Sequence, residues 1–103
     1  MKSILQKNKD YCYLCSILNG DNSYKPDTEE HHIFPGNSNR KLSERYGLKV
    51  YLCIRHHRTG PDAVHKEPNR GNDLLLKQIG QQAFEKRYPF KDFRQVFGKN
   101  YKA

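Results

Sequence analysis

Two short motifs constrain the fold of this sequence more than any other feature: Cys12-x-x-Cys15 and Cys53-x-x-His56. A two-residue spacer lets both side chains of a tight turn converge on one ion, and two such pairs supply the four ligands of a tetrahedral Zn²⁺. Three thiolates and one imidazole fill the coordination sphere, so we expect a closed, structural zinc site. The ion would connect the two motifs across 37 intervening residues and thereby stabilise a fold.

Other interpretations of these side chains stay open from the sequence. Cys12 and Cys15 could form a redox pair, with Cys53 a buried free thiol, and His57 could replace His56 as the fourth ligand. The chain contains an odd number of cysteines, three, and thiols in a reducing compartment serve more often as metal ligands or reactive groups than as disulfides. A thiol redox protein is the weakest of the interpretations, because no βαβ pattern surrounds the motif.

The composition indicates a single small domain with a thin core. The chain has 103 residues, of which 22 are Leu, Ile, Val or Phe, close to the level of about 20% below which charged chains usually stay unfolded. We therefore expect a bound metal to supply part of the stability. No apolar run approaches the roughly 20 residues of a membrane span, and the N-terminal residues are too polar for a signal peptide, so we expect a cytoplasmic protein with no membrane partner.

The formal net charge of +8 is concentrated in two segments. Residues 36–58 carry six Lys/Arg against one Asp/Glu, and residues 70–103 carry eight against three, so each segment has a net charge of +5. Clustered Lys and Arg in a small basic domain are typical of a protein that binds a polyanion, because each neutralised phosphate releases condensed counterions. A solubilising surface is the alternative explanation of the charge.

Apolar spacing and turn residues predict short strands and helices outside the metal motifs. The first expected elements are a turn over 11–15, a strand over 29–34 that ends at Pro35-Gly36, and a helix capped by Ser38 or Asn39 and ended by Gly47. They are followed by a half-buried strand over 48–53, a helix capped by Asn72 and ended by Tyr88-Pro89, and a short helix with Phe90, Phe93 and Phe97 in the core.

Five histidines fall within 35 residues, and four of them remain once His56 fills the second zinc motif: His31, His32, His57 and His65. This density predicts a second site. Because an imidazole either binds a metal in its neutral form or takes up a proton near neutral pH, adjacent histidines can divide those tasks. Neighbours on a regular strand point to opposite faces, so we expect the strand to twist or end at this pair.

Both zinc motifs, together with His31-His32-x-x-Pro35, resemble the HNH endonucleases of the ββα-metal group. Within that group the chain is most similar to small phage-encoded nucleases of the recombination-enhancement, RecA-dependent type. The resemblance spans Cys12 to His65 and implies a small α+β, zinc-stabilised ββα-metal (His-Me finger, treble-clef-like) domain with C-terminal helices. Residues 1–103 would form one nuclease domain, with 12–65 its metal-binding core and 72–98 its helical part.

The resemblance also implies roles for the histidines. His31 would bind the catalytic ion, His32 would act as the general base, and His57 would be a further metal ligand. His65 could be a third ligand only if the loop after Gly60-Pro61 folds back. Such an imidazole-rich set favours Mn²⁺, Zn²⁺ or Ni²⁺ over Mg²⁺. The expected phosphate contacts lie in the basic segment nearest the site, with a solvated surface as the alternative for each: Arg40, Lys41, Arg45 and Arg58.

The sequence departs from the family pattern at two positions. Leu48 stands where the family usually has its middle Asn, so the group that orients His32 would be a backbone carbonyl, Asn37 or Asn39. His56 stands where the second knuckle usually has Cys, a change that keeps a valid zinc ligand.

The function that the resemblance implies is metal-dependent hydrolysis of DNA phosphodiester bonds. DNA would be the partner, with a dimer or a phage recombination protein as a further partner. A non-catalytic zinc module that binds DNA or protein is the alternative function. Such a module would need the zinc motifs and the basic segments but not His31, His32 or His65.

Overall fold

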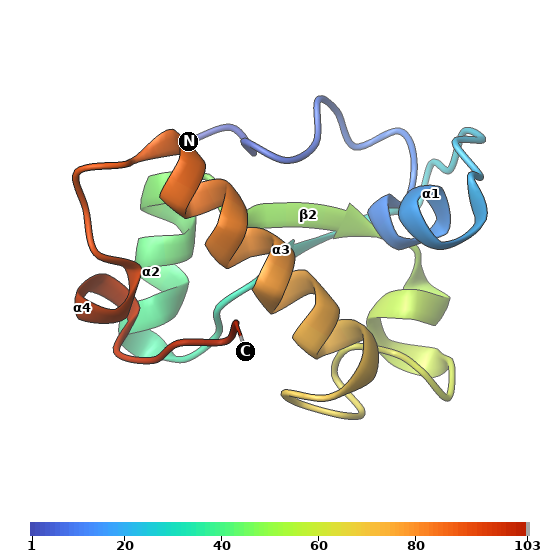
Figure 1. The fold of residues 1–103 in the computed structure, drawn as a ribbon. Coiled ribbons are helices and arrows are strands. Elements are labelled where there is room, and N and C mark those ends of the chain that lie inside the picture. Colours follow the sequence, from blue (N-terminus) through green and yellow to red (C-terminus); the bar gives the residue numbers. More distant parts are fainter. Residues whose placement is uncertain (103) are drawn as a thin grey trace.

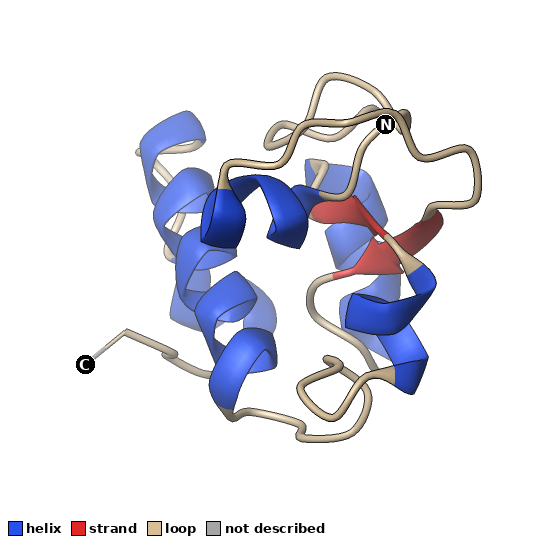
Figure 2. Ribbon diagram, turned by 90° about the vertical axis from the view of Figure 1, so that its right-hand side faces the viewer, coloured by secondary structure: helices blue, strands red, loops and turns tan. Residues whose placement is uncertain are grey.

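The computed structural model of this chain describes residues 1–102, which form a small α+β fold around a two-stranded sheet. Figure 1 shows α1 beside one end of the sheet, α2 beside the other and α3 crossing between them. Helices make up most of the regular structure (Figure 2). The elements are α1 (Tyr13–Asn19), β1 (Glu29–His32), α2 (Asn37–Tyr46), β2 (Lys49–Leu52), the π-helix η1 (Arg55–Thr59), α3 (Gly71–Arg87) and α4 (Phe93–Phe97).

The two strands pair antiparallel, with His31 opposite Val50 and His32 opposite Lys49. Side chains alternate between the faces of a strand, so Glu29 and His31 share one face of β1 while Glu30 and His32 share the other. β1 ends at His32, two residues earlier than the sequence pattern indicates, because Ile33 and Phe34 turn into the core and are fully buried. The strand ends at His32, but it does not twist at the histidine pair: both residues keep the regular register and therefore point to opposite faces.

The N-terminal residues cover the outer edge of β2. The backbone N–H of Ile4 donates to the carbonyl of Gly47 at 2.9 Å, and the N–H of Tyr51 donates to Gln6 Oε1 at 2.8 Å. Gly47 ends α2, as expected, with a φ of 71°, and a Cβ at this position would lie 2.5 Å from the carbonyl oxygen of Lys2. Only glycine therefore fits both the turn and the packing of this segment.

An aromatic cluster forms the core between α2, α3 and α4. The ring of Phe34 lies 5.1 Å from that of Phe93 and 4.8 Å from that of Phe97, centroid to centroid. Helix α3 approaches this cluster at Gly80, where a Cβ would lie 3.2 Å from the Phe34 ring. The expectation that Phe93 and Phe97 are core residues is confirmed. The same prediction for Phe90 is wrong, because its side chain is 100% exposed.

Several boundaries differ from the expected ones because side chains find other partners. Residues 13–15 form the start of α1 instead of part of a turn, and the sulfur of Cys12 caps this helix by accepting from the N–H of Cys15. Gly36 precedes α2, and the side chain of Asn39 donates to the carbonyl of Phe97 instead of capping the helix. Helix α3 begins at Gly71, and the side chain of Asn72 reaches Asp62. No helix among residues 1–102 is long and apolar enough to cross a membrane.

Candidate metal centres

The side chains of Cys12, Cys15, Cys53 and His56 converge at one end of the sheet, with all four ligand atoms within 4.8 Å of one another. The first two cysteines lie at the start of α1, Cys53 follows β2, and His56 lies on η1. The His56 Nδ1 atom is 3.5 Å from the sulfur of Cys12 and 3.4 Å from each of the other two sulfurs. The sulfurs of Cys15 and Cys53 lie 3.9 Å apart.

These distances fit a tetrahedral zinc site. Bond lengths of about 2.3 Å to sulfur and about 2.05 Å to nitrogen give edges of roughly 3.6 Å between sulfur and nitrogen and roughly 3.8 Å between sulfurs. The observed separations of 3.4, 3.5 and 3.9 Å match both edges. His56 rather than His57 completes the set, so this group could hold a structural metal ion.

The thiols of this cluster differ in acidity. Burial, followed by hydrogen bonding to Cys12, raises the pKa of Cys15 to about 12. Burial alone would also raise the pKa of Cys53, but hydrogen bonds from the His56 backbone and from the other two cysteines outweigh it and lower that pKa. Burial lowers the pKa of His56, which keeps its imidazole neutral. Because zinc binds thiolates, metal binding must release protons from this cluster.

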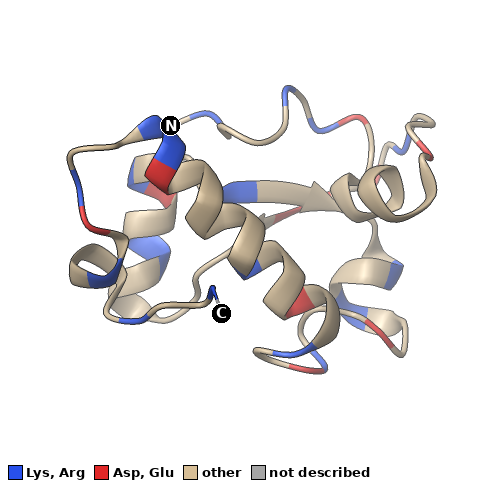
Figure 3. Cartoon of the chain, viewed as in Figure 1, with Lys and Arg blue, Asp and Glu red and all other residues tan. Residues whose placement is uncertain are grey.

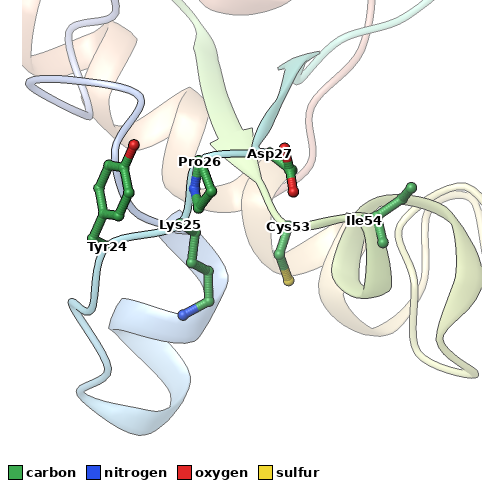
Figure 4. Close-up of a pocket in the computed structure, with 6 residues that line it drawn as sticks. All are labelled: Tyr24, Lys25, Pro26, Asp27, Cys53 and Ile54. Atoms are coloured by element: carbon green, nitrogen blue, oxygen red, sulfur yellow. The ribbon is translucent and has the colours of Figure 1, made fainter.

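A hollow of about 450 Å³ lies beside Cys53 and is walled mainly by apolar groups. Figure 4 shows the side chains of Tyr24 and Ile54 at opposite ends of it. Cys53 is correspondingly half-buried, whereas Cys12 is fully buried. The histidines 31, 32 and 65 do not line this hollow.

The second cluster consists of His31, His57 and His65, whose ligand nitrogens also lie within 4.8 Å of one another. Rings of His57 and His65 are 4.5 Å apart between centroids, and the ring of His31 is 5.2 Å from His57 and 5.3 Å from His65. His31 and His57 are buried, and His65 is exposed. The cluster is therefore open to solvent on the side of His65.

His65 reaches the cluster because the chain folds back after η1. The helix ends before Gly60, and the N–H groups of Val64 and His65 then donate to the carbonyls of His56 and His57, at 2.9 and 3.4 Å. These backbone hydrogen bonds fold the loop after Gly60-Pro61 back on η1, which is what His65 needs in order to join the other two histidines.

A carboxylate determines the protonation pattern of this cluster. Hydrogen bonding to His57 lowers the pKa of Glu29, so the carboxylate is ionised and can only accept. It lies 2.7 Å from His57 Nδ1, which must therefore donate, and the other ring nitrogen of neutral His57 carries a lone pair. His57 Nε2 lies 2.8 Å from His65 Nε2. This carboxylate–histidine arrangement is the outer layer that commonly orients metal-binding imidazoles.

His31 contributes a buried nitrogen without a partner. Among residues 1–102, its Nε2 is the buried side-chain nitrogen or oxygen that has no hydrogen bond. Burial, together with the neighbouring His57 and His65, lowers the pKa of His31 to about 3, so the imidazole is neutral at pH 7. An unsatisfied buried polar group typically costs about 1–3 kcal/mol. A divalent ion bound by these three imidazoles would satisfy this atom, and the donor set fits such an ion.

His32 lies on the opposite face of β1 and contacts a different set of groups. Its Nε2 lies 2.9 Å from Glu44 Oε1 and 3.7 Å from Glu30 Oε1. The pKa of Glu44 falls to about 2 because the N-terminal ammonium, His32 and Lys49 donate to it. An ionised carboxylate only accepts, so His32 Nε2 donates and the lone pair of the neutral imidazole lies on Nδ1.

Glu44 is thus the group that binds and orients the His32 ring, a role for which the sequence predicts a backbone carbonyl, Asn37 or Asn39. Lys49 also binds Glu44, at 3.0 Å, and Glu30, at 3.2 Å. The sequence offered one signal for this cluster, namely the basic residue opposite His32 in the strand register. Glu44 lies on α2, 12 residues from His32 in the sequence, so the sequence alone does not indicate this contact.

The four expected phosphate contacts do not share one location. Arg40 and Lys41 line a hollow of about 310 Å³ together with His32, Glu30 and Glu44. Arg45 lies further along α2 and is exposed, whereas Arg58 lies on η1 with its Nε 3.1 Å from Glu29 Oε1. Figure 3 shows further Lys and Arg on α4 and on the connection between α3 and α4.

A buried ion pair on α3 supports the loop that follows His65. Lys77 Nζ lies 2.9 Å from Asp73 Oδ2 and donates to Asn69 Oδ1 at 2.7 Å. Asn69, which adopts a left-handed conformation with a φ of 63°, also donates its N–H to Asp73. The sequence pattern alone does not reveal this network, because Asp73 and Lys77 look like ordinary surface residues of a helix.

Comparisons with protein-family models, with curated proteins and with solved structures find no match to this chain. The fold and the clusters therefore stand on the geometry of this chain alone.

Proposed function

We propose that this chain is a metal-dependent endonuclease that hydrolyses phosphodiester bonds of DNA. The observation that carries the proposal is that the two adjacent histidines at the end of β1 contact different groups. His31 belongs to a cluster of three imidazoles, and the next residue, His32, is held by a carboxylate on the other face of the strand. A candidate metal site and a candidate proton acceptor thus stand on consecutive residues on the two faces of β1, so a phosphate must bind at the end of this strand to reach both. The resemblance of the two motifs to HNH endonucleases supports the same function.

His31, His57 and His65 are the residues that would hold the catalytic ion. When bound, a divalent ion supplies positive charge that stabilises the transition state and the leaving oxygen of a phosphodiester. Glu29 fixes the ring of His57 and thereby presents its Nε2 lone pair. Burial keeps His31 neutral, as a metal-binding imidazole must be. The imidazole set favours Mn²⁺, Zn²⁺ or Ni²⁺, with Mg²⁺ less suited.

His32 acts as the general base. Its Nδ1 accepts a proton from water, and the water oxygen forms a bond to phosphorus while the bond from phosphorus to the 3′ oxygen breaks. The leaving 3′ oxygen takes a proton from solvent, which gives a 5′ phosphate and a 3′ hydroxyl. Glu44 contributes by accepting from Nε2, because this hydrogen bond orients the ring and stabilises the imidazolium that forms.

Cations beside His32 would bind the DNA backbone. Arg40 and Lys41 line the same hollow as His32, and Lys49 neutralises part of the charge of Glu30 and Glu44. Phosphate contacts of this kind position the nucleic acid without reading its sequence. The thiol cluster, which consists of Cys12, Cys15, Cys53 and His56, would hold a structural zinc that connects α1 to the residues after β2.

A plasmid-nicking assay with Mg²⁺, Mn²⁺, Zn²⁺ and Ni²⁺ tests this function. We expect the wild-type chain to nick supercoiled plasmid, and His32→Ala to lose about 10²- to 10⁴-fold in rate, the usual contribution of a general base. His32→Gln serves as a matched variant, because it retains a hydrogen-bond donor towards Glu44 but has no proton acceptor. Both variants should keep the zinc content and the DNA affinity of the wild type. Nicking by His32→Ala at the wild-type rate would show that the base is misassigned.

A non-catalytic zinc-stabilised module that binds DNA or protein is the second candidate. The observation in its favour is that Glu44 also binds Lys49 and the N-terminal ammonium, so the contact with His32 could serve only to hold α2 against the sheet. This candidate predicts one tightly bound zinc per chain and no nicking with any of the four metals.

A further inference from the structure

Phe90 is an aromatic side chain that the fold leaves entirely in solvent. It is 100% exposed, whereas Phe34, Phe84, Phe93 and Phe97 are all buried. In a chain with so few apolar residues, the exposure of a whole phenyl ring is unfavourable relative to its burial. The fold itself gives no reason for a phenyl ring at this position.

The backbone beneath Phe90 is firmly anchored. Tyr88, two residues earlier, packs its ring 5.1 Å from that of Tyr46 and 5.2 Å from that of Phe84. Its hydroxyl donates to the carbonyl of Tyr46, and its own carbonyl accepts from the N–H of Lys91 at 3.0 Å. The turn that carries Phe90 is therefore fixed at both sides, and the ring is presented to solvent on a rigid support.

The charge around this turn is positive. Three cations, Lys86, Arg87 and Lys91, outnumber the one acidic residue, Asp92, between residues 86 and 92, and all four side chains are exposed. The ammonium of Lys91 lies 5.8 Å from the centre of the Tyr46 ring, which places it beside the C-terminal end of α2. Glu44 and Arg45 belong to the same end of that helix, so the turn lies at the end of the molecule that also carries His32 and its partner.

Two other exposed apolar residues, Tyr24 and Ile54, differ in their surroundings. They lie beside the thiol cluster at the far end of the sheet, and they line one hollow with Lys25, Asp27 and Cys53. There a single lysine is balanced by an aspartate, and no run of cations accompanies the exposed groups. Phe90 thus differs from these residues in its charged surroundings as well as in its degree of exposure.

We propose that Phe90 stacks on an unpaired nucleobase of a bound nucleic acid, while Lys86, Arg87 and Lys91 bind the adjoining phosphates. An exposed aromatic ring among cations matches the two features of single-strand binding, because every base has a face for stacking and every linkage has a charge. A duplex whose bases are paired and stacked offers no free face. The inference extends the proposed function by naming a second contact with the substrate, but it is measured by binding and does not depend on cleavage.

The chain has no tryptophan, so Phe90→Trp introduces a single fluorescent reporter at the proposed contact. We expect a single-stranded 20-mer of thymidine nucleotides to quench this emission in a saturable manner, and a duplex of the same length to quench it less. Tyr24→Trp is the matched control, because that position is 72% exposed but lies beside the thiol cluster. Its emission should not change at the same oligonucleotide concentrations.

Affinity measurements with the same oligonucleotide complete the test. Phe90→Ala should weaken binding about 5- to 100-fold, the range for loss of one stacked base, whereas Phe90→Tyr and Tyr24→Ala should bind as the wild type does. Thermal unfolding should be the same for Phe90→Ala and wild type, because the ring makes no packing contribution.

Three results would overturn the inference: no quenching at Phe90→Trp, wild-type affinity in Phe90→Ala, or equal quenching by the duplex. A response of Phe90→Trp to anionic phospholipid vesicles but not to the oligonucleotide would also overturn it, in favour of a membrane surface. Quenching at Phe90→Trp in a chain that nicks no plasmid would leave this inference standing and would contradict the nuclease proposal alone.

Discussion

Two consecutive residues of η1, His56 and His57, contribute to two different clusters, and the clusters differ in what holds their ligands. The Nδ1 atom of His56 lies within 3.5 Å of the three sulfurs that would share a metal with it. His57 instead donates from Nδ1 to the Glu29 carboxylate, and it lies beside the imidazoles of His31 and His65, of which His65 is exposed. The first arrangement is closed on itself and connects distant segments. The second is oriented by outer partners and stays open on one side.

This difference is the basis for our proposal that the thiol cluster stabilises the fold and that the imidazole cluster is available for chemistry. A closed set of thiolates and imidazole leaves no position for a substrate, which is typical of structural zinc. An open set with an oriented imidazole leaves a side from which a substrate can approach. Variants that affect one cluster and leave the other intact test whether the two clusters have these different roles.

The largest effect is expected from loss of the thiol cluster. Cys12 is a ligand candidate, is fully buried and caps α1. Because a structural zinc contributes on the order of 10 kcal/mol to folding, and small domains are stable by only about 5–15 kcal/mol, Cys12→Ser should be largely unfolded at 25 °C. Circular dichroism and zinc content measure this. His65→Ala is the control, and it should remain folded with zinc bound; a folded Cys12→Ser chain would contradict the structural role.

The next largest effect concerns the support of the imidazole cluster. Lys77→Met leaves the carboxylate of Asp73 buried without its partner and removes a donor to Asn69, so the free energy of unfolding should fall by about 3–5 kcal/mol. Urea denaturation measures the loss. Lys86→Met changes an exposed lysine of the same helix and should alter stability by less than about 0.5 kcal/mol. An equal, small effect of both variants would show that the ion pair does not support this loop.

A smaller, more selective effect is expected at the outer partner of His57. Glu29→Gln should weaken binding of Mn²⁺ or Ni²⁺ about 10- to 100-fold, the usual consequence of losing such a partner, with no change in tightly bound zinc. Isothermal titration calorimetry measures the affinity. Glu30→Gln is a matched control, since this neighbour lies on the other face of β1 and contacts Lys49 instead. Equal losses in both variants would indicate a general electrostatic effect and not a role for Glu29.

The smallest effect is a pH dependence from His31. Burial lowers its pKa from 6.5 to about 3, so below pH 6.5 the unfolded chain takes up a proton that the folded chain does not. The contribution of this group is therefore complete above pH 6.5 and falls with decreasing pH, by about 1.4 kcal/mol per pH unit. With zinc retained in the thiol cluster and the imidazole cluster free of metal, the wild type should lose about 2 kcal/mol more than His31→Gln between pH 6.5 and 5. Parallel profiles from urea denaturation would show that His31 titrates normally.

The ligands of the thiol cluster were predictable from the sequence because two-residue spacers restrict where side chains can point. The two-residue spacer also predicted His56 as the fourth ligand, with His57 as the alternative, and the face of η1 that meets the sulfurs decides for His56. His65 was predictable only conditionally, because its approach requires the backbone hydrogen bonds to His56 and His57 that the loop makes after Gly60.

The partners of the histidines escaped prediction for a different reason. Glu29 and Glu44 are ordinary charged residues in the sequence, and only the strand register and the packing of α2 bring them to His57 and His32. Phe90 was predicted as a core residue because it precedes Phe93 and Phe97 at a plausible spacing. Helix α4 begins only at Phe93, with Asp92 as its cap, so the periodicity does not extend to Phe90.

A chelator titration that follows metal content, plasmid nicking and circular dichroism on the same samples tests the division between the two clusters most directly. The account predicts two steps. A weak chelator removes one metal per chain and abolishes nicking while the spectrum stays unchanged, and a stronger chelator then removes the zinc and unfolds the chain. Nicking that persists after the first metal is lost, or a chain that stays folded after both are lost, would contradict it.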